Sequence, residues 1–129
     1  MNAVPAKTTI LLVEDDRGLR FLLQLELEAQ GFRVLDYGSA EEALAASPTT
    51  SLDEIDLAVL DYHLPGHTGL QLLQSLRSLR GQVPALVITS EKDLIHHPRW
   101  PGRHTALLAK PFCRDSFLSS VNGCLSHGT

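Results

Sequence analysis

The chain has 129 residues, of which 43% are hydrophobic and 20% charged, and its formal net charge is −4. This length fits one compact domain, and a mean hydropathy near zero excludes a globally disordered chain. No apolar run reaches the ~20 residues that a membrane-spanning helix needs. Residues 1–9 lack the apolar segment of a secretory signal, and the acidic balance argues against a nucleic-acid-binding surface.

In chain order, the sequence first predicts a buried strand over 8–13, which is apolar and β-branched and stops at a run of acids. Leucines at helical spacing then predict an amphipathic helix over 17–30. A second strand is expected over 32–37. Ser39 and Glu42 have the spacing of a capping box, which predicts that a short helix begins there.

The rest of the chain alternates in the same way. It predicts a polar loop at 47–54, strands at 57–60, 85–89 and 106–109, and helices at 70–80 and 115–125. A further helix that would begin at Glu91 is expected to stay short, because Pro98 and Pro101 cannot continue it.

Strands that alternate with helices favour a parallel sheet covered on both faces. Because crossover connections are right-handed, five such units fit the flavodoxin-like doubly wound (βα)5 fold of the α/β class, with a five-stranded sheet in the order 2-1-3-4-5. We expect a single domain over 1–129, with its core at about 8–126 and no output domain in this chain. Ligands of such folds bind beyond the carboxyl ends of the strands.

Polar residues follow four of the predicted strands at their carboxyl ends. They are Glu14, Asp15 and Asp16 after the first strand, Asp61 after the third, Thr89 and Ser90 after the fourth, and Lys110 and Pro111 after the fifth. Several carboxylates close together repel one another unless a cation lies among them, and Mg²⁺ prefers carboxylates together with phosphate oxygens. A hydroxyl and an ammonium beside them suit a phosphoryl group. The four strand ends together therefore predict a magnesium and phosphoryl site.

Each of these residues also has an ordinary structural explanation. Asp15 or Asp16 could cap the first helix, and Asp61 could be a loop residue that bonds its own backbone. Thr89 alone is a common strand residue, and Lys110 alone is a surface charge. Only their joint placement indicates a function.

The cysteines and histidines do not predict a redox or zinc site. Cys113 and Cys124 form no C-x-x-C motif and no disulfide framework, which indicates packing residues in a reducing compartment, the cytoplasm. His63 and His67 have metal-ligand spacing only on a helix, whereas the Pro-Gly pair between them predicts a loop.

Four short motifs occur at the predicted strand ends. They are Leu-Leu-Val-Glu-Asp-Asp at 11–16, Leu-Asp-Tyr-His-Leu-Pro-Gly-His-Thr-Gly-Leu at 60–70, Val-Ile-Thr-Ser at 87–90 and Lys-Pro-Phe at 110–112. With these motifs, the sequence resembles the receiver domain of two-component response regulators over essentially its whole length.

The resemblance implies an acceptor and a metal site. Asp61 would accept a phosphoryl group from a phosphohistidine on a sensor histidine kinase or a phosphotransfer protein. Asp15 and Asp16 would position Mg²⁺ (or Mn²⁺), with Asp16 as the direct ligand. Asp61 and the backbone carbonyl of His63 would be further ligands.

The resemblance also implies a set of residues that respond to the phosphoryl group. Thr89 and Lys110 would contact it, and the bond from Lys110 to Pro111 is expected to be cis. The expected switch or modulating positions are Ser90, Glu91, Leu107 and Pro111. The side chains of His63 and Glu91 would tune the lifetime of the phosphoryl group.

Two features depart from the family pattern. Leu107 lies three residues before the lysine, where the family usually has Tyr or Phe, so it cannot supply the ring whose rotamer follows the threonine. Pro98 and Pro101 interrupt the region of the fourth helix. Trp100 there either contacts a partner or fills a local hydrophobic site.

The leading interpretation is a phosphoacceptor signalling domain and not an enzyme, although with intrinsic self-phosphorylation and autodephosphorylation chemistry. It would switch contacts with an unidentified downstream protein, without direct nucleic-acid binding or membrane insertion, as a monomer or weak homodimer. The chain is either a stand-alone protein or a receiver excised from a hybrid kinase or a transcription regulator.

Three other function classes stay open. A Mg²⁺-dependent phosphatase or phosphotransferase with an aspartyl nucleophile would usually carry a second Asp where His63 stands. A flavodoxin-like FMN binder would have Ser, Thr and Gly instead of acids after the first strand, because acids repel phosphate. A pseudo-receiver that only binds partners would not need the acids, Thr89 and Lys110.

Overall fold

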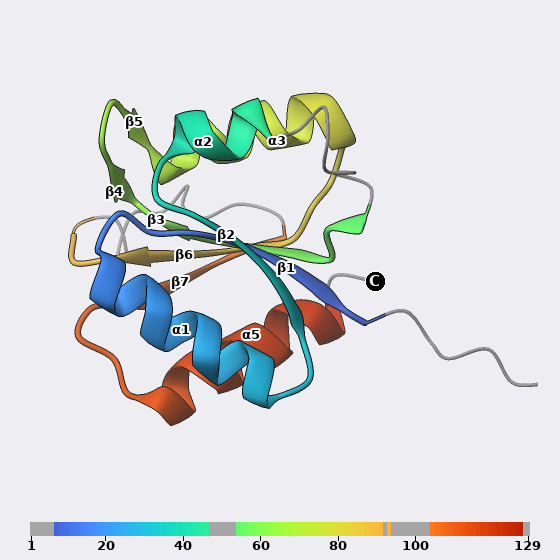
Figure 1. Cartoon of the computed structure of the whole chain (residues 1–129), viewed down its shortest axis with the longest axis vertical. Coiled ribbons are helices and arrows are strands. Elements are labelled where there is room, and N and C mark those ends of the chain that lie inside the picture. Colours follow the sequence, from blue (N-terminus) through green and yellow to red (C-terminus); the bar gives the residue numbers. More distant parts are fainter. Residues whose placement is uncertain (1–6, 47–53, 92, 94–103, 128–129) are drawn as a thin grey trace, which may run out of the picture.

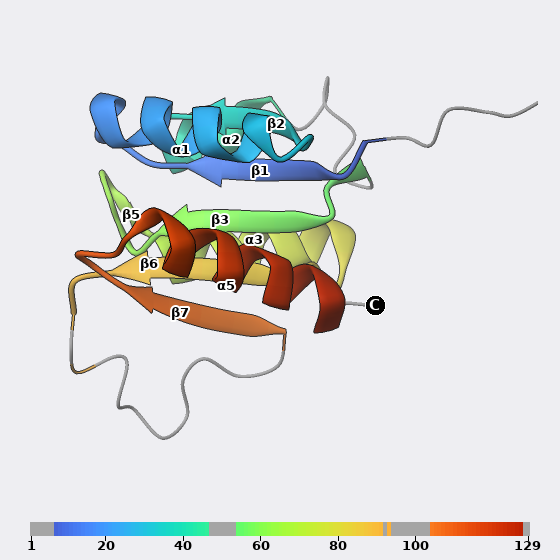
Figure 2. The same ribbon diagram turned by 90° about the horizontal axis from the view of Figure 1, so that it is seen from below.

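The computed structural model describes residues 7–46, 54–91, 93 and 104–127. A central sheet lies between two layers of helices (Figure 1). On one face lie α1 (Arg17–Ala29) and α5 (Arg114–His127), and on the other lie α2 (Ala40–Ala45) and α3 (Gly69–Arg80). Figure 2 shows the strands running in one direction beneath α1 and α5. The helices therefore cover both faces, as expected for a doubly wound sheet.

The sheet is fully parallel. Its strands are β1 (Thr9–Val13), β2 (Arg33–Tyr37), β3 (Leu57–Asp61), β6 (Ala85–Thr89) and β7 (Thr105–Ala109). Their order in space is β2-β1-β3-β6-β7, and every neighbouring pair is parallel. This order confirms the predicted 2-1-3-4-5, because β4 and β5 form a separate small hairpin.

The core lies on both sides of the sheet. Every residue of β1, β3 and β6 is buried, and alternate residues join different apolar clusters. Leu11 and Val13 pack in the cluster that includes α2 and α3, whereas Ile10 and Leu12 pack in the cluster that includes α1 and α5. Burial on both faces explains why the central strands are almost continuous apolar runs.

Side-chain oxygens begin three of the helices. The carboxylate of Asp16 accepts a hydrogen bond from the backbone of Leu19 at the start of α1, and Ser39 Oγ accepts one from Glu42 at the start of α2. Thr68 and Gln71 form a complete capping box at the start of α3. These caps therefore begin each helix at the edge of the sheet where the polar residues gather.

The backbone that follows Asp61 is held close to the sheet. The antiparallel hairpin of β4 (His63–Leu64) and β5 (His67–Thr68) replaces the loop predicted there, with Gly66 in its turn at a φ of 75°. Gly69 then begins α3, and an added Cβ at this position would lie 2.4 Å from the carbonyl oxygen of Asp61. Only glycine permits this approach.

Two predicted segments lie outside the described residues. They are most of the loop at 47–54 and most of the short helix expected from Glu91, together with Pro98, Trp100 and Pro101 beyond it. Across the part of the chain that the structure describes, no helix combines the length and apolar character needed to cross a membrane.

Candidate functional site

The carboxyl ends of four adjacent strands bring five polar side chains together. Glu14 and Asp15 follow β1, Asp61 ends β3, Thr89 ends β6, and Lys110 follows β7. Glu14, Asp61 and Thr89 are buried, with exposed fractions of 1%, 5% and 0%. Asp15 is exposed. Buried polar groups at one edge of an apolar sheet are costly unless they are paired, so this rim is where chemistry is expected.

Three carboxylates form a cluster at this rim. Oxygen atoms of Glu14, Asp15 and Asp61 all lie within 4.8 Å of one another. Burial, and then a hydrogen bond with Asp61 and its negative charge, raise the pKa of Glu14 to about 7. A divalent cation would relieve this repulsion, and three carboxylates are hard oxygen ligands of the kind that Mg²⁺ prefers.

Lys110 is the cation of the rim. Its Nζ lies 3.3 Å from an oxygen of Asp61 and 3.4 Å from an oxygen of Glu14. Burial alone would lower the pKa of Lys110, but attraction to these two carboxylates outweighs it and raises the pKa above its ordinary value. The amine therefore stays protonated and points at the acids. The Lys110–Pro111 bond is cis, which confirms the sequence prediction.

Asp16 does not join the acidic cluster. Its Oδ1 accepts a hydrogen bond from the backbone N–H of Leu19 at 3.0 Å, as the cap of α1. Glu14 occupies the place by the cluster that the sequence analysis gave to Asp16, because the chain turns into α1 directly after Asp15. The acid that directly follows the last strand residue, rather than the last acid of the run, is the one that lies by Asp61.

The two side chains expected to tune the lifetime of the phosphoryl group lie side by side. His63 Nε2 is 2.9 Å from Glu91 Oε1, and both side chains are about half exposed. His63 follows Asp61 by two residues, and Glu91 follows Thr89 by two. The pair therefore links the hairpin after β3 to the segment after β6.

Thr89 is buried and already hydrogen-bonded. Its Oγ1 accepts a bond from the backbone N–H of Glu91 at 2.9 Å, which ties the hydroxyl to the segment that follows β6. Ser90 in that segment is exposed. Leu107 lies in β7 opposite Val87 of β6 and is partly buried, as expected for a packing residue.

An apolar groove of about 490 Å³ adjoins the rim. It lies between α1 and the segment that joins β7 to α5, and Leu22, Ser90, Lys110 and Pro111 are among its lining residues. An ion pair between Glu26 of α1 and Arg114 of α5 lies at the same groove. Lys110 therefore belongs both to the acidic site and to the groove.

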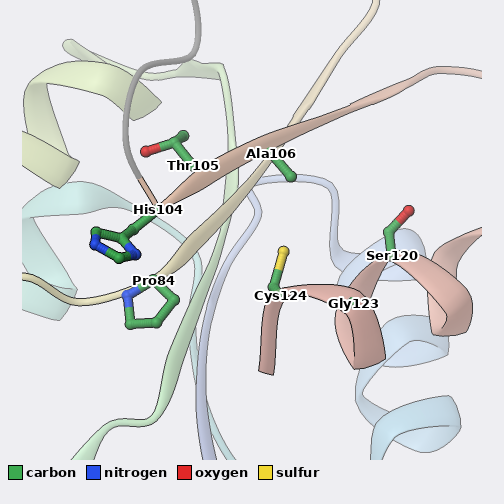
Figure 3. Close-up of a pocket in the computed structure, with 7 residues that line it drawn as sticks. All are labelled: Pro84, His104, Thr105, Ala106, Ser120, Gly123 and Cys124. Atoms are coloured by element: carbon green, nitrogen blue, oxygen red, sulfur yellow. The ribbon is translucent and has the colours of Figure 1, made fainter. Parts of the chain in front are cut away.

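A second cavity of about 400 Å³ lies at the other end of the sheet. Figure 3 shows Pro84, at the entry to β6, and Thr105, at the start of β7, near Cys124 of α5. Burial raises the pKa of the Cys124 thiol, which disfavours a reactive thiolate. Among the described residues that line this cavity none is a carboxylate, and the cavity lies apart from the rim site.

Known proteins share sequence similarity with most of this chain. The family model of the response regulator receiver domain matches residues 10–122. The C4-dicarboxylate transport transcriptional regulatory protein DctD of Rhizobium meliloti is 32% identical over 128 residues, which cover 94% of this chain and 25% of that protein. The uncharacterized transcriptional regulatory protein YkoG of Bacillus subtilis is 31% identical over 126 residues, which cover 92% and 51%. The chain thus spans between a quarter and about half of these relatives.

Solved structures share the fold. A CheY-like response regulator receiver domain protein from Methanospirillum hungatei has a TM-score of 0.80 at 24% identity, covering 95% of this chain and 97% of that one. The receiver domain of the hybrid histidine kinase CckA has a TM-score of 0.74 at 28% identity, covering 91% and 98%. The chain therefore belongs to the family of response regulator receiver domains of two-component signalling.

Proposed function

We propose that Asp61 accepts a phosphoryl group from a phosphohistidine of a sensor histidine kinase or a phosphotransfer protein, in a reaction that needs Mg²⁺ (or Mn²⁺). The supporting observation is that Asp61 is buried between two other carboxylates and the Lys110 ammonium. When all four groups are charged, three negative charges and one positive charge leave a balance of −2, which one divalent cation neutralises. Glu14, Asp15, Asp61 and the backbone carbonyl of His63 are the groups that would hold it.

Phosphoryl transfer to Asp61 depends mainly on how the reacting groups are positioned, because a carboxylate is a weak nucleophile. A carboxylate oxygen of Asp61 forms a bond to phosphorus while the phosphorus–nitrogen bond breaks and the imidazole leaves with the electron pair. Lys110 Nζ neutralises charge on the transferred oxygens. A divalent cation held by the carboxylates of the rim would add to this charge neutralisation.

Thr89 carries the signal away from the site. Its Oγ1 accepts the bond from Glu91, so its own O–H proton can be donated to a phosphoryl oxygen. A shift of Thr89 toward that oxygen would pull on Ser90 and Glu91. Because Leu107 offers no ring to follow this shift, the segment after β6 is the element that responds.

The pair of His63 and Glu91 sets the lifetime of the phosphoryl group. His63 follows Asp61 by two residues and bonds Glu91, so the pair would place a carboxylate near the path of an attacking water. Replacing Glu91 with Ala is expected to change the rate at which the acyl phosphate decays, measured by loss of the phosphorylated species over time. An unchanged rate in this variant and in His63→Ala would contradict this role.

The domain works by protein contact and not as a catalyst of turnover. A phosphatase of the aspartyl-nucleophile type is disfavoured, because His63 stands where its second Asp would lie and turns its side chain to Glu91. We place a single domain over 1–129, active in the cytoplasm as a monomer or weak homodimer. The phosphoryl donor is the sensor histidine kinase or phosphotransfer protein, and the downstream target is a protein rather than nucleic acid or membrane.

The decisive experiment is mass spectrometry after treatment with acetyl phosphate and Mg²⁺. The native protein is expected to gain one phosphoryl group, which is lost in Asp61→Asn. Asp115→Asn is the matched control, because Asp115 is an exposed aspartate far along the chain in α5. Absence of the adduct on native protein, or its retention in Asp61→Asn, would overturn the proposal.

A further inference from the structure

The outer face of α1 is unusually apolar for a helix surface. Phe21, Leu22 and Leu25 are 61%, 52% and 47% exposed, whereas Leu23 and Leu27 of the same helix are buried in the core. Three of the four large hydrophobic side chains that are exposed in the described part of the chain lie on this helix. Apolar residues are common singly on surfaces, but a contiguous group on one helix indicates a contact surface.

The spacing of this face is that of a helix-pairing surface. Gly18, Leu22, Leu25 and Ala29 follow one another at intervals of four, three and four residues, which is the seam of paired helices. Phe21 lies beside Leu25, one turn away. The small residues at both ends of the seam would let a second helix approach closely.

Charges at the two ends of α1 are opposite. Arg17 is exposed at the amino end and Glu28 at the carboxyl end, and neither makes an ion pair with any residue that the structure describes. Eleven residues separate them, which is about three helical turns, so both lie on the same flank of the apolar seam. Their midpoint along the helix is level with Leu22, which belongs to the exposed group.

We propose that this face of α1 binds the same face of a second copy of the chain, with the two helices antiparallel about a two-fold axis near Leu22. In this arrangement Phe21 packs against Leu25 of the other copy, and Arg17 meets Glu28 of the other copy at both ends. A parallel arrangement would instead set Arg17 against Arg17 and Glu28 against Glu28. The surface is self-complementary only when antiparallel, as an isologous interface requires.

The contact is expected to be weak and concentration-dependent. It involves one helix face, which is less area than a stable protein interface of standard size buries. Since Leu22 also lines the groove beside Lys110, the dimer would cover one wall of the approach to the rim. Self-association through this face would therefore narrow access to the rim from the side of α1.

Sedimentation velocity over a series of protein concentrations tests the contact. The native protein is expected to show a concentration-dependent dimer, and Phe21→Glu is expected to abolish it. Leu79→Glu is the matched control, because Leu79 is 62% exposed on α3, on the opposite face of the sheet. Circular dichroism checks that both variants are folded. A native protein that is monomeric throughout, or equal effects of the two variants, would overturn the proposal.

A charge swap tests the antiparallel geometry. Arg17→Glu alone and Glu28→Arg alone each set like charges against one another, so each is expected to dimerise at least several-fold more weakly. The double variant restores opposite charges and is expected to recover the native dimer. Failure of the double variant to recover would contradict the antiparallel pairing. If the native protein stays monomeric and Phe21→Glu slows transfer from a phosphohistidine protein, the face belongs to the donor and the self-association proposal falls.

Discussion

Two half-buried cations lie at opposite ends of the sheet, and they contact different groups. Lys110, at the carboxyl end, faces the carboxylates of Glu14 and Asp61. Arg77 of α3 lies at the amino end, and its partners include the carbonyl of Val83 at 3.0 and 3.2 Å, the carbonyl of His104 at 3.2 Å and Thr105 Oγ1 at 2.9 Å. Burial lowers the pKa of Arg77, whereas the acids raise that of Lys110.

This difference separates stability from chemistry along the strands. Arg77 ties α3 to the starts of β6 and β7 through carbonyl and hydroxyl oxygens, which holds the fold. Lys110 lies among carboxylates whose excess negative charge a metal cation can neutralise. A basic residue is thus structural at one end of the sheet and, in the proposed function, part of the phosphorylation site at the other.

Lys110→Ala should give the largest effect. Removing the ammonium is expected to slow phosphorylation of Asp61 by acetyl phosphate about 10²–10³-fold, the loss typical of one charge-stabilising group in a reaction site. The rate of appearance of the phosphorylated mass is the measurement. Lys7→Ala, an exposed lysine before β1, serves as the control and should react at the native rate. A similar rate in both variants would put Lys110 outside the chemistry.

The acidic end should also make stability depend on pH. The pKa of Glu14 is about 7 in the folded protein and 4.5 for the free group, so the folded state favours the protonated form. The stability that Glu14 contributes is therefore fully present below about pH 4.5 and is lost as the pH rises through 7. For the metal-free protein this is worth up to about 3 kcal/mol. Urea unfolding from pH 5 to 8 should show a fall that is flatter in Glu14→Gln, and equal slopes would contradict the assignment.

Metal binding should distinguish Asp15 from Asp16. Asp15→Asn is expected to weaken Mg²⁺ binding about 10–100-fold, a loss found even for outer partners of metal sites. Asp16→Asn should keep both the metal and the helix, because Asn is as good an N-cap as Asp. The rise in melting temperature with Mg²⁺ reports the affinity. Loss of the Mg²⁺ response in Asp16→Asn but not in Asp15→Asn would restore Asp16 as the direct ligand.

The stability of the fold should depend on Arg77 at the amino end of the sheet. Arg77→Ala is expected to lower the free energy of unfolding by about 1–2 kcal/mol, because its carbonyl partners lose charged donors while water reaches part of the site. Arg77→Lys should recover only part of this, since a lysine lacks the planar fork. Phosphorylation by acetyl phosphate should stay at the native rate in both. A slower rate would show that the two ends are not independent.

Much of the fold could be predicted from local patterns. The apolar runs of β1, β3 and β6 are unambiguous because both faces of those strands are buried, and Ser39 with Glu42 marked the start of α2. The hairpin after Asp61 was missed, since two-residue strands such as His63–Leu64 have no period to detect. Arg77 was missed too, because its partners Val83 and Thr105 meet it only through the fold.

The sequence by itself determined the order of elements and the four strand ends that carry acids, a hydroxyl and a lysine, because both depend on hydrophobic period and on where it stops. Only the tertiary structure decided between neighbours. In the run of three acids, Glu14 interacts with Asp61, whereas Asp16 accepts a hydrogen bond from the backbone of α1. Which acid does which depends on where the strand ends and the helix begins, to within one residue. The same holds for α1, where the fold alone shows which leucines are buried and which are exposed.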